Sequence, residues 1–135
     1  MKKMLLIKIA YWLGIGADAL WAVGLLFPSV FGLLVGNPDF DPDLQTRLIM
    51  GIGCSLMTGW TLLLLWAVRK PIERRGVILL TAFPVVLGML ITAIVGMLGG
   101  GSANTWILVK STILIVSMVG SYVLADRIAR GYVKV

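Results

Sequence analysis

The segment from Met4 to Phe27 reads MLLIKIAYWLGIGADALWAVGLLF, and its charged residues are Lys8 and Asp18. A helix needs about 20 mostly apolar residues to cross the hydrocarbon core of a bilayer. The segment contains no small-residue cleavage site of the kind that ends a signal peptide. We therefore interpret residues 5–27 as a first membrane span and not as a removed signal. This span holds a carboxylic acid at a depth where an ionised group is costly.

The composition extends this interpretation to the whole chain. Of its 135 residues, 59% are hydrophobic and 13% are charged, whereas a soluble domain has about 45–50% apolar and about 25% charged residues. Further apolar runs cover residues 47–68, 71–98 and 106–125. Because open sheet edges cannot be satisfied in hydrocarbon, these runs predict helices. Short connections between them favour a single domain, 1–135: an all-α, integral membrane four-helix bundle of up-down-up-down topology.

Proline and aspartate mark the expected boundaries of the helices. Residues 29–35 are too few to cross a bilayer and predict a short helix at its surface. Asp41 is expected to cap the next helix, with Pro42 at the first helical position. Pro71 is expected to open the third span, and Pro84 is expected to kink it.

Basic residues are distributed unevenly over the two ends of the predicted bundle. A glycine-rich hairpin is expected at residues 99–105 and a basic tail at residues 126–135. Arg47 and three aspartates occupy the end opposite the termini. Because lysine and arginine are retained on the cytoplasmic side of membrane proteins, we expect both termini in the cytoplasm and the chain in the cell (inner) membrane. The end with the termini carries Lys2, Lys3, Lys8, Arg69, Lys70, Arg74, Arg75, Arg127, Arg130 and Lys134.

This topology also accounts for the net charge of +6. The basic residues do not form one continuous stripe, so we do not expect a nucleic acid as partner. We expect the lipid bilayer as the partner of the chain, with anionic lipids at its cytoplasmic face.

Small residues recur every four positions on two of the spans. One row is Gly51, Ser55 and Gly59, and the other is Gly88, Thr92 and Gly96. Such rows allow close approach of two helices in lipid. Two interpretations remain: packing between helices of one bundle, and a contact between copies of the chain in a homo-oligomer.

Asp18, Lys110 and Arg47 are the polar residues from which a site could be built. With the first and fourth spans antiparallel, Asp18 and Lys110 both fall in the half of the membrane that faces away from the cytoplasm. Arg47 lies at the mouth of the second span on the same side. An acid inside a membrane that gains and loses a proton is what coupling to a ligand or ion requires.

Two structural alternatives account for the same residues. Asp18 and Lys110 could neutralise each other and fix the packing of two helices. Lys110 could instead extend to the headgroups, which would leave Asp18 protonated. Trp21 and Trp60 lie within spans, where they either line a pocket for an organic cation or fill space between helices.

Several chemistries lack the residues that they need. The chain has one cysteine, Cys54, and no histidine, so an internal disulfide and the commonest general base and metal ligand are excluded. The alternating Asp39, Asp41 and Asp43 lack the glycine and glutamate of a calcium-binding loop, and Pro42 interrupts them. No nucleophile–base pair is visible. We therefore expect no metal, no cofactor and no enzymatic activity.

Ala17-Asp18, followed by Trp21 in the first of four spans, resembles the small multidrug resistance transporters. In that family an intramembrane glutamate from each subunit of a dimer binds protons and cationic drugs alternately, so the resemblance implies this role for Asp18. The chain differs in having an aspartate at this position, a lysine in the fourth span and a strong orientation bias. Residues 42–47 and 69–76 also resemble those of uncharacterised prokaryotic four-span membrane proteins, which imply no activity.

Two functions are consistent with these features. The first is a membrane protein that binds or transports a small ligand or ion through Asp18, with Lys110, Arg47, Trp21 and Trp60 around it. The alternative is a structural or assembly subunit of a membrane complex that acts through helix–helix packing and a basic cytoplasmic face.

Overall fold

The computed structural model describes residues 2–98 and 105–132, and these residues form helices and connecting turns without any strand. The predicted hairpin at 99–104 and the last residues of the predicted tail, 133–135, lie outside the described residues. The elements, in chain order, are α1 (Lys2–Leu26), α2 (Pro28–Val35), α3 (Leu44–Ala67), α4 (Arg75–Leu80), the π-helical η1 (Thr81–Val86), α5 (Leu87–Leu98) and α6 (Thr105–Tyr132).

The described chain contains four helical segments that are long and apolar enough to cross a membrane, as the sequence predicts. α4, η1 and α5 run on as one of them. The segments suggest a multi-pass membrane protein, since each exceeds the length that a bilayer core requires. Their bounds are Lys3–Leu26, Leu44–Ala67, Arg75–Leu98 and Ile107–Gly131.

Helix α3 begins two residues later than the sequence suggests, and its cap is Asp43. The Oδ1 atom of Asp43 accepts a hydrogen bond from the backbone N–H of Thr46 at 2.9 Å. This bond holds the pKa of Asp43 below its ordinary value. The prediction of Asp41 as cap and Pro42 as first helical residue is therefore wrong, because Asp43 has the extended backbone that an N-cap requires.

The third span also begins later than predicted, at Arg75 instead of Pro71. The residues between α3 and α4 form a tight connection that side chains tie to the neighbouring helices. The Tyr11 hydroxyl donates to the backbone oxygen of Arg74 at 3.0 Å. The guanidinium carbon of Arg74 lies 3.4 Å from the ring centroid of Trp66, and its NH1 donates to the Trp66 carbonyl. These contacts delay the start of α4 until Arg75.

Helix α6 continues through most of the segment that the sequence assigns to a basic tail. Asp126 accepts hydrogen bonds from Arg75 of α4 and pairs with Arg130 one turn further along α6. The respective N···O distances are 3.2 and 2.7 Å. Asp126 is thus paired on both sides, and the helix continues past it and ends at Tyr132.

The changes in helix geometry at Pro28 and Pro84 agree with the predictions from the sequence. Pro28 is the first residue of the short helix α2, which ends where Gly36 adopts a φ of 77°. Only glycine adopts this conformation without strain. At Pro84, where the sequence predicts a kink, helical hydrogen bonding changes to the wider π pattern of η1. Proline has no N–H to give to the regular ladder.

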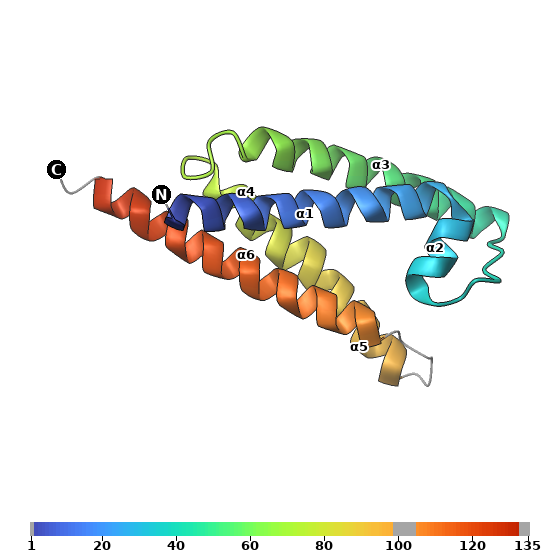
Figure 1. The fold of residues 1–135 in the computed structure, drawn as a ribbon. Coiled ribbons are helices and arrows are strands. Elements are labelled where there is room, and N and C mark those ends of the chain that lie inside the picture. Colours follow the sequence, from blue (N-terminus) through green and yellow to red (C-terminus); the bar gives the residue numbers. More distant parts are fainter. Residues whose placement is uncertain (1, 99–104, 133–135) are drawn as a thin grey trace.

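Figure 1 shows that α1 lies between α3 and α6, while α4, η1 and α5 pack along α6. α1, α3, α4 and α6 meet at the end where α1 begins and α6 ends, which we call the basic end. The α1–α3 pair and the α5–α6 pair then diverge toward the other end, which we call the α2 end. No residue of α5 is buried.

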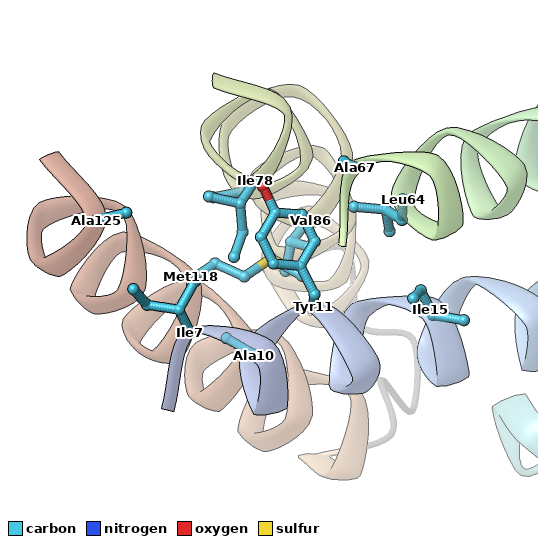
Figure 2. Close-up of a cluster of buried hydrophobic side chains, with 11 residues drawn as sticks. Ile7, Ala10, Tyr11, Ile15, Leu64, Ala67, Ile78, Val86, Met118 and Ala125 are labelled. Carbon is cyan, nitrogen blue, oxygen red and sulfur yellow. The ribbon is translucent and has the colours of Figure 1, made fainter. Parts of the chain in front are cut away.

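The buried core lies near the basic end, where α1 meets α3, α4 and α6 (Figure 2). The Tyr11 side chain is fully buried and points among Ile78, Val86 and Met118. The core consists of Ile7, Ala10, Tyr11, Ile15, Leu64, Ala67, Ile78, Ala82, Val86, Met118 and Ala125.

The two rows of small residues do not serve packing inside the described bundle. Gly51, Ser55 and Gly59 are exposed on α3. A Cβ added at Gly51, Gly59, Gly88 or Gly96 would meet nothing within 4 Å. The first of the two interpretations of these rows is therefore wrong for the part of the chain that the structure describes.

Candidate functional site

Asp18 lies on the buried face of α1. It shares this face with Tyr11, Gly14, Ile15 and Ala22, which are also buried. Of the whole Asp18 residue, 4% is exposed. Among the described residues, its Oδ2 atom has no hydrogen-bond partner. An ionised carboxylate without a partner is very costly in an apolar interior.

The packing of α1 against α3 defines the depth of Asp18. The two helices run antiparallel (Figure 1), and Gly14 lies against the Leu64 side chain. Four residues further along α1, Asp18 is therefore level with Trp60. The Trp60 indole nitrogen donates to Thr81 Oγ1 at 2.9 Å, and the Thr81 hydroxyl donates to a backbone carbonyl within its own helix. Trp60 thus joins α3 to η1 beside the acid.

Lys110 does not form an ion pair with Asp18 in the described part of the chain. Gly14 also lies against Met118 of the antiparallel α6, which makes Asp18 level with Leu114. Lys110 lies about one turn, or ~6 Å, nearer the α2 end. The interpretation in which these two side chains neutralise each other directly has no support from this geometry.

Arg47 lies in the first turn of α3, where its side chain contacts the preceding loop, and it is not brought to Asp18. Its NH2 atom lies 3.6 Å from the Asp41 carboxylate, and its Nε donates to the Pro42 carbonyl at 3.3 Å. Both charged side chains of this pair are exposed. At the first turn of α3, Arg47 lies beyond the level at which α1 ends.

A cavity of about 280 Å³ opens between α1 and α6, next to the acid. Trp21 and Lys110 both line it, as the sequence-based site requires. Asp18 does not, although the preceding Gly16 and Ala17 do. The cavity is lined by Trp12, Leu13, Gly16, Ala17, Leu20, Trp21, Leu34, Met89, Ile107, Lys110, Ser111 and Leu114.

A second cavity, of about 290 Å³, continues from the first toward α2. The two share Trp21, Met89 and Ile107. The Trp21 ring packs edge-on against Phe31 of α2 with 6.0 Å between centroids, so Trp21 forms a wall between α1 and α2. Trp60 lines neither cavity, and its role is the hydrogen bond to Thr81.

Lys110 and Trp21, which the sequence suggests as site residues, line the same cavity. Two further residues of its lining are not predicted from the sequence. Met89 and Leu34 reach the cavity from α5 and α2, and ordinary apolar residues give no signal of this. The role of Thr81 depends on its hydrogen bond with the Trp60 indole, which the sequence alone does not reveal. The described residues contain no group of three or more histidine, cysteine or acidic side chains that could hold a metal ion.

Compared with models of protein families, with curated proteins and with solved structures, the chain matches none of them.

The Trp60–Thr81 hydrogen bond is expected to contribute to the packing of α3 on η1. In a double-mutant cycle of Trp60→Phe and Thr81→Val, we expect a coupling energy of about 0.6–1.7 kcal/mol, the range for interhelical hydrogen bonds in membrane proteins. Unfolding of the protein in mixed micelles gives the four free energies. Strictly additive effects would show that the bond does not join the two helices.

Proposed function

We propose that this chain is a membrane protein that binds or transports a small ligand or ion, with Asp18 as the acid that exchanges a proton for it. The single observation that supports the proposal is the burial of Asp18 with an Oδ2 atom that no described residue satisfies. A carboxyl group kept in this state for structural reasons alone would be destabilising, whereas a neutral acid that releases its proton to a cation would be functional.

The surroundings of Asp18 support the same role. Trp60 lies at its level, and the cavity wall formed by Gly16, Ala17 and Trp21 begins one residue away. Aromatic faces attract organic cations. Lys110, one turn away, is the charged side chain of the cavity lining. We propose no catalytic role for any of these residues.

The proposed orientation follows from the charges at the basic end. Lys8 and Arg69 are exposed there, and the pairs of Glu73 and Asp126 leave the end with an excess of positive charge. Retention of such charge on the cytoplasmic side supports a cytoplasmic location for both termini, in the cell (inner) membrane, with anionic lipids around this end.

Replacing Asp18 with asparagine tests the proposal. For the wild-type protein in lipid nanodiscs, we expect saturable binding of a lipophilic cation such as tetraphenylphosphonium, weaker at acid pH because protons compete for Asp18. We expect Asp18→Asn to lose at least about 90% of this binding and all of its pH dependence, since the amide carries neither a proton to exchange nor a charge. Equilibrium dialysis of the labelled cation measures both.

Asp41→Asn is the matched control, because Asp41 is exposed and lies outside the spans. It should bind as the wild-type protein does. Equal binding and an equal pH profile for Asp18→Asn and the wild type would overturn the proposal.

The alternative function, an assembly subunit, is favoured by one observation. The row of Gly51, Ser55 and Gly59 is exposed on α3, where a second helix could approach it closely. Under this alternative the wild-type protein binds no cation specifically, so Asp18→Asn and the wild type give the same low, non-saturable signal.

A further inference from the structure

A long apolar groove follows the seam between α1 and α6 on a face of α1 that Asp18 does not share. Its first part is the 280 Å³ cavity that Lys110 lines. Its second part is a third cavity, also of about 290 Å³, which lies nearer the basic end and shares Leu13 with the first cavity. The second part is lined by Leu6, Ile9, Ala10, Leu13, Val116, Ser117, Gly120, Ser121 and Leu124.

The two parts of the groove together are elongated. From Lys110 to Leu124 it follows α6 for about 21 Å at ~1.5 Å per residue. Gly16 on one side and Gly120 on the other keep it open, because a Cβ at either position would meet nothing within 4 Å. An extended acyl chain has this shape, whereas a compact polar solute does not.

Charge in the groove is found at one place. Among the residues that line its two parts, Lys110 is the charged side chain, and the lining on the basic-end side of it is apolar except for serine hydroxyls. Lys110 lies about 8 Å from the start of α6, which is near the depth of lipid headgroups for a helix that spans a bilayer. A cation at headgroup depth with an apolar groove leading inward is complementary to an anionic amphiphile.

We propose that the α1–α6 groove binds a single-chain anionic lipid, with its acid group at Lys110 and its acyl chain against Trp12 and Leu13 toward Gly120. The groove shares its first cavity and Lys110 with the surroundings of Asp18, but Asp18 itself lies on another face of α1 and lines neither part of the groove. Binding here adds a lipid-dependent property to the protein whether or not a cation is exchanged.

The test uses tryptophan quenching by bromine, which requires contact. The protein in phosphatidylcholine nanodiscs is titrated with undecanoate that carries bromine on its terminal carbon, and in parallel with the matching bromoundecanol. We expect saturable quenching by the acid at concentrations at least about tenfold lower than by the alcohol, because a charge-assisted hydrogen bond to Lys110 is available to the acid alone. Equal titration curves for the acid and the alcohol would overturn the proposal.

Two variants identify the site, each with a matched control. Lys110→Gln should shift the acid titration by about tenfold toward that of the alcohol, while Lys8→Gln, at an exposed lysine of the same helix bundle, should not. Gly120→Leu should fill the groove and abolish saturable quenching, while Gly59→Leu, at an equally open position on α3, should leave it intact. Quenching unchanged in both Lys110→Gln and Gly120→Leu would also overturn the proposal.

Asp18→Asn separates this proposal from the proposed function. We expect its quenching by the bromo acid to match that of the wild type, because Asp18 does not line the groove. A loss of cation binding without a loss of quenching assigns the two properties to different sites, whereas a loss of quenching in Asp18→Asn would contradict the placement of the lipid in this groove.

Discussion

Replacing Tyr11 with alanine is expected to lower the free energy of unfolding by about 3–5 kcal/mol, as for other large aromatic side chains removed from a packed interior. Tyr11 is fully buried and lies at the point where α1 meets α4, η1 and α6 (Figure 2). Its removal leaves a cavity among Ile78, Val86 and Met118. It also removes one of the two hydrogen bonds that the Arg74 carbonyl accepts, the other coming from the Val77 N–H.

Tyr11→Phe separates these two contributions, because it keeps the ring and removes the hydroxyl. We expect a loss of about 0.5–1.5 kcal/mol, the net contribution of one hydrogen bond, because the Arg74 carbonyl still accepts from the Val77 N–H. Unfolding by increasing fractions of a denaturing detergent in mixed micelles, followed by helical circular dichroism, measures both variants. If Tyr11→Ala lowered the free energy of unfolding no more than Tyr11→Phe does, the Tyr11 ring would not be packed in the core at the basic end.

Replacing Gly14 with leucine is the second change with a large expected effect, a loss of about 1–3 kcal/mol from overpacking. At this glycine, α1 lies close to both α3 and α6. Even a Cβ there would lie 2.7 Å from Met118 Cε and 3.4 Å from Leu64 Cδ1. Met118 can move its end, but it is itself buried, so the whole side chain of leucine requires the helices to separate.

Gly16→Leu is the matched control for Gly14→Leu. The two glycines are two positions apart on α1, but a Cβ at Gly16 would meet nothing within 4 Å. We expect the stability of Gly16→Leu to stay within about 0.5 kcal/mol of the wild type. Equal losses for the two variants in the same unfolding assay would contradict the close packing of the three helices at Gly14.

The helical fold could be predicted from the sequence because its signals are local. Length and apolar composition alone identify the four candidate spans, and Pro28 and Pro84 mark real changes in helix geometry. The choice between Asp41 and Asp43 as cap could not be made this way. Both acids precede the same helix, and the backbone conformation that distinguishes them depends on how the loop lies against its neighbours.

The candidate site could be predicted only in part, because helix rotation is not visible in a single sequence. Asp18, Lys110 and Trp21 were selected for their chemistry and depth, and depth follows from the rise along a helix. Which face of α1 carries Asp18 follows from packing at Gly14 and Tyr11, and this turns the acid toward α3 and away from the cavity that Lys110 lines. Arg47 was selected for its position along the chain, but it pairs with the adjacent loop.

The helices of this protein are held together at one end. Tyr11, Arg74 and Asp126 fasten the segments there, whereas α5 buries none of its residues. The distance between α2 and α5 is thus the dimension that internal contacts constrain least. In a bilayer, the lateral pressure of the surrounding acyl chains acts on α2 and α5 at the α2 end. Membrane thickness and lipid packing would therefore set the width of the opening beside Trp21.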